Sequence, residues 1–185
     1  MKAKFLTALI FLALIGSAAY AVDVDGVLVP NEYAKEISLD KGNFRILWRI
    51  VDDRLHMAID AKAAGWISVG FEPTSVMANS DMIFGMLGKD GVLQTVDAWS
   101  TGMFGPHPPD ANQGGSDSIL ASAARRSGDR VVFEFSRLLA TGDKFDKTVP
   151  SAGKFKVIWA YSSSLQFNAK HSRGGNVTLE MDGSR

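Results

Sequence analysis

Two side chains in this sequence, the thioether of Met77 and the imidazole of His171, could act together as ligands of one metal ion. His171 lies between Lys170 and Arg173, just ahead of a Gly-Gly pair. Two nearby cations disfavour protonation of the imidazole, and a neutral imidazole is either a metal ligand or a proton acceptor. Met77 lies in the polar segment SVMANSD, where a methionine on its own is expected to pack at the rim of the core.

Considered as a pair, the thioether and the imidazole are a usual axial set for an electron-transfer haem. The two residues are 171 − 77 = 94 positions apart, so no local motif joins them. The other histidines are expected to be solvated. His56 alternates with core residues along a strand, and His107 lies among prolines in GPHPPD.

The chain has no cysteine, which excludes a covalent c-type haem, thiolate zinc, iron–sulfur clusters and a cysteine nucleophile. There is no Gly-x-Ser-x-Gly elbow and no His-Glu-x-x-His motif. The segment DANQGGSD places oxygens at Asp110, Asn112 and Ser116, but no Glu stands at the twelfth position of an EF-hand loop. Any cofactor must therefore be held by His, Met, carboxylate or contact alone.

The first 21 residues have the pattern of a secretory signal peptide. Lys2 and Lys4 precede an apolar run at 5–15, and Ala19-Tyr20-Ala21 forms a small-x-small cleavage site. We expect an exported protein, periplasmic or extracellular, with residues 22–185 as a single soluble domain and no membrane span after cleavage. That domain has 18 basic and 20 acidic residues and no clustered basic face, so nucleic acid is not an expected partner.

The hydrophobic pattern of the domain has a period of two almost throughout, which is typical of strands. Apolar residues alternate along 44–50, 55–61, 67–71, 131–135, 155–161 and 177–181. Turn signals separate these runs, and the longest irregular stretch is 100–117. Nine or ten short strands with few helical windows predict an all-β fold, an antiparallel β-sandwich.

Several segments, in order, resemble the DOMON family. They are GWISVGFEPTSVMANSDMIFGML, DGVLQTVDAWS, FEFSRLLATGDKFD and VIWAYSSSLQFNAKHSRGG, and the similarity covers roughly residues 24–182. The resemblance implies an immunoglobulin-like β-sandwich. It is strongest to the haem-binding branch, which includes the cytochrome domain of cellobiose dehydrogenase.

In that branch the loop Met and the late His are the axial ligands of the haem iron, which correspond here to Met77 and His171. A related branch uses Lys in place of His, which would make Lys170 the second ligand. We prefer His171 because HSRGG matches the His-ligated pattern. Without a Cys-x-x-Cys-His motif the cofactor would be haem b, bound non-covalently.

Other residues near the two ligands are candidates for the haem pocket. Aromatic residues that could form its wall, or equally well pack in the core, are Trp66, Phe71, Trp99, Tyr161 and Phe167. Arg173 or Lys170 could pair with a haem propionate, with a solvated charge as the equal alternative.

With both axial positions filled, we predict one-electron transfer between redox partner proteins and no enzyme activity of the domain itself. Two alternatives remain. One is a haem-free module that binds a sugar or a metal ion or mediates interactions. The other is a haem accessory subunit of a redox enzyme.

Overall fold

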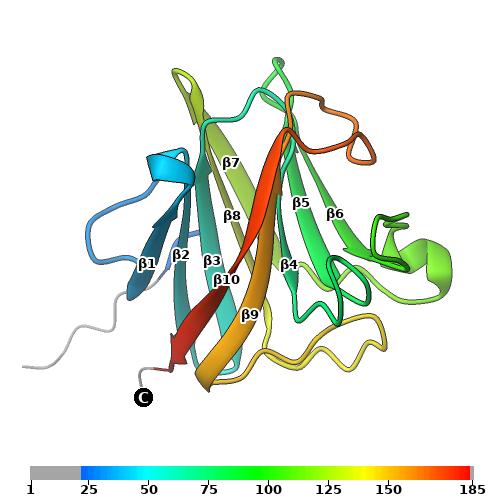
Figure 1. The fold of residues 1–185 in the computed structure, drawn as a ribbon. Helices are drawn as coiled ribbons and strands as arrows, with labels where there is room; N and C mark the ends of the chain where they lie inside the picture. The colour runs from blue at the N-terminus through cyan, green and yellow to red at the C-terminus, as the bar shows by residue number, and fades with distance from the viewer. Residues whose placement is uncertain (1–21, 184–185) are drawn as a thin grey trace, which may run out of the picture.

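The computed structural model describes residues 22–183, so the predicted signal peptide lies outside the described part of the chain. Residues 22–183 form two antiparallel five-stranded sheets that pack face to face (Figure 1). The predicted all-β antiparallel sandwich is therefore confirmed. The described helices are short 3-10 turns, η1 (Asp40–Gly42) and η2 (Asp110–Gln113), and neither has the length or apolar character to cross a membrane.

The strand order is β1-β2-β3-β8-β7 in the first sheet, here called sheet A, and β10-β9-β4-β5-β6 in the second, sheet B. Sheet A consists of β1 (Lys35–Leu39), β2 (Phe44–Val51), β3 (Arg54–Ala61), β8 (Arg130–Leu138) and β7 (Ala121–Ser127). Sheet B consists of β10 (Arg173–Asp182), β9 (Ala152–Tyr161), β4 (Ile67–Phe71), β5 (Asp81–Leu87) and β6 (Leu93–Trp99).

The main core lies between the sheets and takes every second residue of the central strands, because side chains alternate across a strand. On β8 the inward residues include Val131, Phe133 and Phe135, all buried. Gly85 on β5 faces one of these rings, and a Cβ there would lie 2.6 Å from a Phe133 ring carbon. Glycine at this position therefore allows the close approach of the two sheets.

The outer face of sheet A is covered by the segment before β1. Glu134, buried on this face, accepts a hydrogen bond from the Tyr33 hydroxyl at 2.8 Å and one from the backbone N–H of Gly26 at 2.5 Å. Burial raises the pKa of Glu134, and these donors counter that rise. The buried carboxylate thus fixes the N-terminal segment to the sheet.

His56 lies on the same outer face, as the alternation predicts. It is half-buried rather than exposed, because β3 is the central strand of sheet A and has β2 and β8 on either side. Burial lowers its pKa, with a smaller contribution from Arg54.

Candidate functional site

The inner face of sheet B is apolar, and part of its outer face is apolar as well, unlike a sheet that has one face wholly in water. Its outer face carries a second buried cluster, made of Trp66, Met82, Phe84, Met86 and Ala98. Three loops cover this cluster, at residues 72–80, 100–118 and 162–172 (Figure 1). Met77 from the first loop and Phe167 from the third pack directly against it.

Two adjoining cavities, of about 450 Å³ and about 390 Å³, lie between the outer face of sheet B and these loops. Both are lined by Met77 and His171, together with Met82, Phe104 and Lys170, so they are two lobes of one space. None of the lining residues is acidic. Each volume is in the range of small-molecule and cofactor sites, about 300–1,000 Å³.

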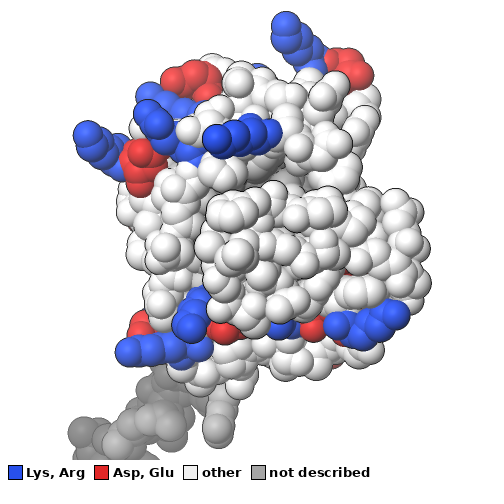
Figure 2. Space-filling view, turned by 45° about the vertical axis from the view of Figure 1, so that its right-hand side comes forward, with Lys and Arg blue, Asp and Glu red and all other residues white. Residues whose placement is uncertain are grey.

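The loops around this space expose apolar side chains to solvent. Val76 is 55% exposed, Met103 is 48% exposed and Phe104 is 81% exposed. In Figure 2, which brings forward the right-hand side of Figure 1, the centre of the face carries no Lys, Arg, Asp or Glu, and charged side chains gather above and below it. An apolar face with a charged rim is typical of a surface that meets another molecule.

Met77 is held by a tight loop between β4 and β5. The backbone N–H of Ala78 donates to the carbonyl of Ser75 at 2.7 Å, and that of Thr74 donates to the carbonyl of Ala78 at 2.9 Å. Val76 has a φ of +51°, which is rare for a β-branched residue. The loop is thus fixed in a strained conformation in which Met77 lines the cavity.

His171 reaches the cavity from the opposite end of sheet B. Because β4 and β9 are antiparallel, the loop after β9 leaves the sheet where β4 begins, and the loop of Met77 leaves where β4 ends. The Ser162 hydroxyl donates to the carbonyl of Lys170 at 3.2 Å and fastens the loop just before His171. The topology therefore brings residues 94 positions apart to one cavity, and their role as ligands remains a prediction.

The expectation that His107 is solvated is wrong. The imidazole is half-buried on the cavity wall, its centroid 6.3 Å from that of the Phe84 ring. A bridge between Ala98 and Pro109 folds the proline-flanked loop back over the sheet. Burial and, to a lesser extent, His171 lower the pKa of His107. Its Nδ1 is buried and has no hydrogen-bond partner within residues 22–183.

The predicted wall residues fall on two different faces of sheet B. Trp66 and Phe167 line the cavity, as expected, and both pack against Phe84 at centroid distances of 5.3 Å and 5.7 Å. Phe71 lies on the inner face with Phe155, so of its two expected positions, cavity wall and core, it has the core one. Trp66, just before β4, and Phe71, at its end, are five residues apart. Residues an odd number of positions apart in extended chain point to opposite faces of the sheet.

Trp99, Tyr161 and Arg173 do not line the cavity either. Trp99 is the cross-strand neighbour of Asp81, with its ring 6.1 Å from that of Phe145. The Tyr161 hydroxyl donates to Asp40 at 2.7 Å, away from the cavity. Arg173 begins β10 and is exposed, whereas Lys170 does line the cavity.

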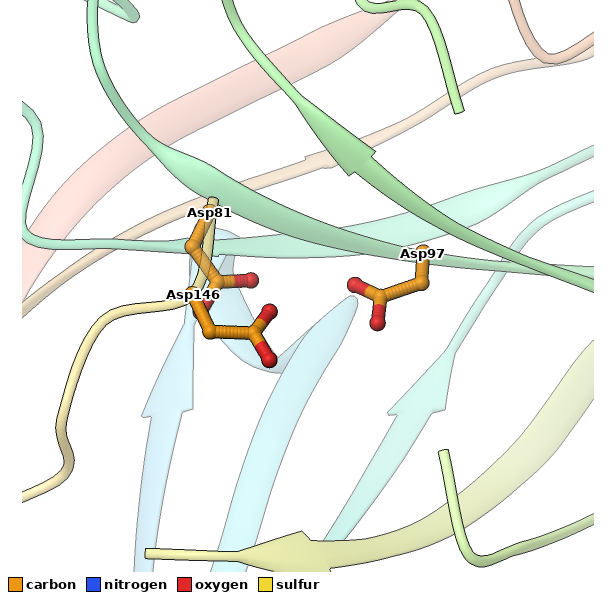
Figure 3. Close-up of side chains that lie close together, drawn as sticks. All are labelled: Asp81, Asp97 and Asp146. Carbon is orange, nitrogen blue, oxygen red and sulfur yellow. The ribbon is translucent and has the colours of Figure 1, made fainter. Parts of the chain in front are cut away.

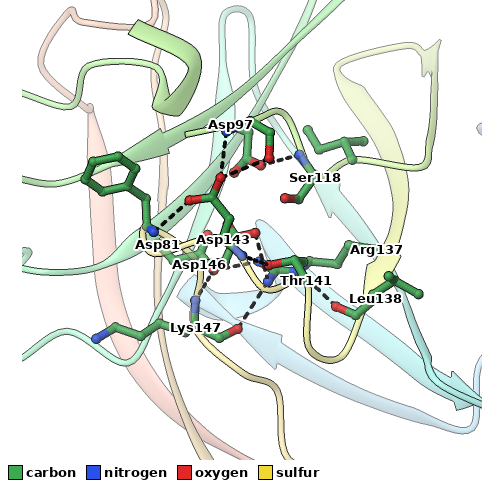
Figure 4. Close-up of polar contacts among 12 residues, drawn as sticks. Asp81, Asp97, Ser118, Arg137, Leu138, Thr141, Asp143, Asp146 and Lys147 are labelled. Atoms are coloured by element: carbon green, nitrogen blue, oxygen red, sulfur yellow. Dashed lines mark hydrogen bonds and ion pairs between the residues drawn. The ribbon is translucent and has the colours of Figure 1, made fainter. Parts of the chain in front are cut away.

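A second group of polar side chains lies on the inner face of sheet B, where Asp81, Asp97 and Asp146 point toward one another (Figure 3). Arg137 on β8 crosses from sheet A and donates to Asp81 at 2.6 Å (Figure 4). Its other terminal nitrogen is 3.7 Å from Asp146. The backbone N–H of Lys147 also donates to Asp81, at 2.8 Å. Both members of the Arg137–Asp81 pair are completely buried.

The carboxyl groups of this region are hard to ionise. Burial raises the pKa of Asp97 to about 7. Burial, with repulsion from Asp97, raises the pKa of Asp110 to about 8. Burial also raises the pKa of Asp81 to about 6, in spite of the neighbouring Arg137. Between about pH 5 and pH 7, these carboxyl groups are therefore at least partly protonated in the folded protein, whereas in the unfolded chain they are ionised.

These shifts predict that the protein loses stability as the pH rises. From pH 5 to pH 8, the unfolded chain has its aspartates ionised, whereas Asp97 and Asp110 stay partly protonated when folded. The folded state then binds more protons, so the free energy of unfolding falls with increasing pH, by up to about 1.4 kcal/mol per pH unit for each group. Urea denaturation in EDTA at pH 5, 6, 7 and 8 measures this slope, and a flat or rising curve would contradict it.

Fold and site together define a class of protein: an antiparallel β-sandwich with a ligand-sized cavity on the outer face of one sheet. Residues 40–162 match the DOMON domain family, and the chain belongs to that family. The matched segment includes Met77 and Trp66 and ends before His171.

Two known proteins are similar to this chain. DBH-like monooxygenase protein 1 of Mus musculus is 31% identical over 132 residues, which is 71% of this chain and 20% of the mouse protein. The chain thus spans about a fifth of that relative's length. The cytochrome domain of Myriococcum thermophilum cellobiose dehydrogenase has a similar fold, with a TM-score of 0.52 and 11% identity, covering 80% of this chain and 81% of that one.

Proposed function

We propose that this domain is a b-type cytochrome domain that binds haem without a covalent link and passes single electrons between redox partners. One observation carries the proposal. Met77 and His171, from loops at opposite ends of sheet B, line the same cavity. A thioether and an imidazole across an apolar space are the donor set of an electron-transfer haem.

The lining residues fit the cofactor in charge as well as in donor type. A porphyrin has a large apolar ring and two anionic propionates. The cavity wall is mostly apolar, contains no acidic residue and includes Lys170 as a cation. The Nε1 of Trp66 and the Nδ1 of His107 are buried without a partner within residues 22–183, so both are free to meet a polar group of a ligand.

Each residue has a distinct part in this proposal. His171 would anchor the iron through imidazole, and Met77 would complete the axial set with a soft sulfur that favours the reduced metal. The apolar wall keeps water from the site and stabilises the bound state by burial. With haem bound, the site would supply reversible one-electron chemistry at iron.

The proposal includes export and a protein partner. The leader-like residues 1–21 support export to the periplasm or the extracellular space. The exposed Phe104 and Val76, beside the cavity, support docking of a redox protein at this face. A permanent place beside a redox enzyme, as an accessory subunit, would use the same surface and the same chemistry.

The direct test is a visible absorption spectrum of the purified protein reconstituted with hemin, before and after dithionite. We expect sharp α and β bands in the reduced protein, because two strong axial ligands make the iron low-spin. The matched control is heat-denatured protein with the same hemin. If the folded protein gives no haem bands, the cytochrome proposal fails and the haem-free binding module replaces it.

A further inference from the structure

The buried aspartates between the sheets form a site separate from the cavity. Asp81 and Asp97 lie on β5 and β6, on the inner face of sheet B, whereas the cavity lies over the outer face. Asp146 joins them from the segment between β8 and β9. One oxygen from each of the three carboxylates lies within 4.8 Å of the others (Figure 3).

These carboxylates are buried, yet they accept few hydrogen bonds. Asp81 and Asp97 are 0% and 4% exposed, and the side chain of Asp146 is 2% exposed. One oxygen of Asp81, one of Asp97 and both of Asp146 are buried without a hydrogen bond from residues 22–183. Unpaired buried polar atoms are costly, so groups of them in a folded protein indicate a missing partner.

Arg137 supplies that partner only in part, through a hydrogen bond to Asp81 and an ion pair with Asp146 at 3.7 Å. Its nitrogens already donate to Asp81, to the carbonyl of Lys147 at 3.1 Å and to the carbonyl of Leu138 at 3.3 Å. When ionised, the three aspartates carry a charge of −3 and Arg137 carries +1, which leaves −2. One divalent cation would balance the charge.

A fourth carboxylate lies close by. Asp110, at the start of η2, is completely buried, and neither of its carboxyl oxygens has a hydrogen-bond partner in the described chain. The bridge between Ala98 and Pro109 brings it next to the β6 strand that carries Asp97. In the sequence Asp110 belongs to a segment with only a poor match to a calcium loop. The fold gives it buried acidic neighbours that the segment itself lacks.

We propose that Asp81, Asp97 and Asp146 bind one calcium ion between the two sheets. All the donors are oxygen atoms, which favours a hard cation. Three carboxylates in one buried site favour Ca²⁺, because Mg²⁺ keeps several waters and is usually bound through only one or two carboxylates. The ion would link β5 and β6 to the segment 139–151 and so close this end of the sandwich.

The test is thermal unfolding of haem-free protein after dialysis against EDTA, with and without 1 mM calcium chloride. A rise in Tm on the order of 5 °C is expected if the ion is present at about 100 times its dissociation constant. Isothermal titration with calcium chloride should give one site per chain. The proposal is overturned if neither Tm nor heat responds to calcium, or if magnesium acts more strongly than calcium.

Matched variants distinguish a calcium site from a cluster of buried carboxyl groups that is neutralised only by taking up protons. Asp97→Asn and Asp146→Asn should lose the calcium response. Asp129→Asn makes the same change in the turn between β7 and β8, at an aspartate whose side chain is 71% exposed, and it should keep the response. Asp97→Asn should fold well in EDTA because it removes a buried charge. Loss of its calcium response can therefore not be ascribed to misfolding. A full calcium response in Asp97→Asn would refute the site, and because no haem is present this outcome leaves the cytochrome proposal intact.

Discussion

His171→Ala is expected to lower the affinity for haem by on the order of 100-fold or more. Imidazole is the stronger of the two proposed anchors, and the chain has no cysteine that could hold the porphyrin after its loss. Even partners of metal ligands cost about 10–100-fold when they are mutated. Titration with hemin, followed by absorbance and by Tm, measures the loss, because haem that binds only the folded state raises its stability.

Met77→Ala should give a different result, namely haem that is still bound but with one axial position open. The iron should become high-spin, carbon monoxide should bind, and the midpoint potential should fall because the soft sulfur is gone. His107 complicates this variant, since its neutral imidazole lies on the same wall. Met77→Ala/His107→Ala removes that rival donor and should give the clean high-spin spectrum.

Lys170→Ala is the matched control for the His171 variant. Lys170 lines the cavity one residue away and is the ligand in the alternative assignment. Its loss should leave the low-spin spectrum nearly unchanged and weaken binding only through the lost cation. If Lys170→Ala abolishes the low-spin bands and His171→Ala keeps them, lysine is the ligand and the present assignment is wrong.

The strands of this fold could be predicted because every second residue along them is apolar, as at Val131, Phe133 and Phe135 on β8. The cavity could be predicted only in part. For Trp66 and Phe71 the sequence leaves wall and core equally open, because alternation shows which residues share a face but not which face a loop will cover. The position of His107 depends on a loop that folds back at Pro109, which no local pattern indicates.

The buried ion pair was missed, although its signal is present in the sequence. The inward alternation of β8 continues past Phe135 to Arg137, and that of β5 runs from Ile83 back to Asp81. A charged residue in an inward position needs a partner, and the two are 56 residues apart on different sheets. Strand alternation locates each charge, but only the packing of the sheets shows that they meet.

Arg137→Leu is expected to be among the most destabilising single changes in the chain, at about 3–5 kcal/mol near pH 8. The substitution removes a guanidinium with 0% exposure and leaves Asp81 and Asp146 buried without their counter-charge. Urea denaturation of both proteins in EDTA measures the difference. It should shrink toward pH 5, where the carboxyl groups take up protons and no longer need the cation.

Two further variants decide whether the loss comes from the uncompensated charge. Arg54→Leu makes the same substitution at an arginine whose side chain is 56% exposed, and it should cost no more than about 1 kcal/mol. Arg137→Leu/Asp81→Leu removes both members of the pair and should recover a substantial part of the stability, because an apolar pair in a buried site is often as stable as an ion pair. If Arg137→Leu costs no more than Arg54→Leu, or if its cost is the same at pH 5 and pH 8, then Arg137 does not neutralise the buried aspartates.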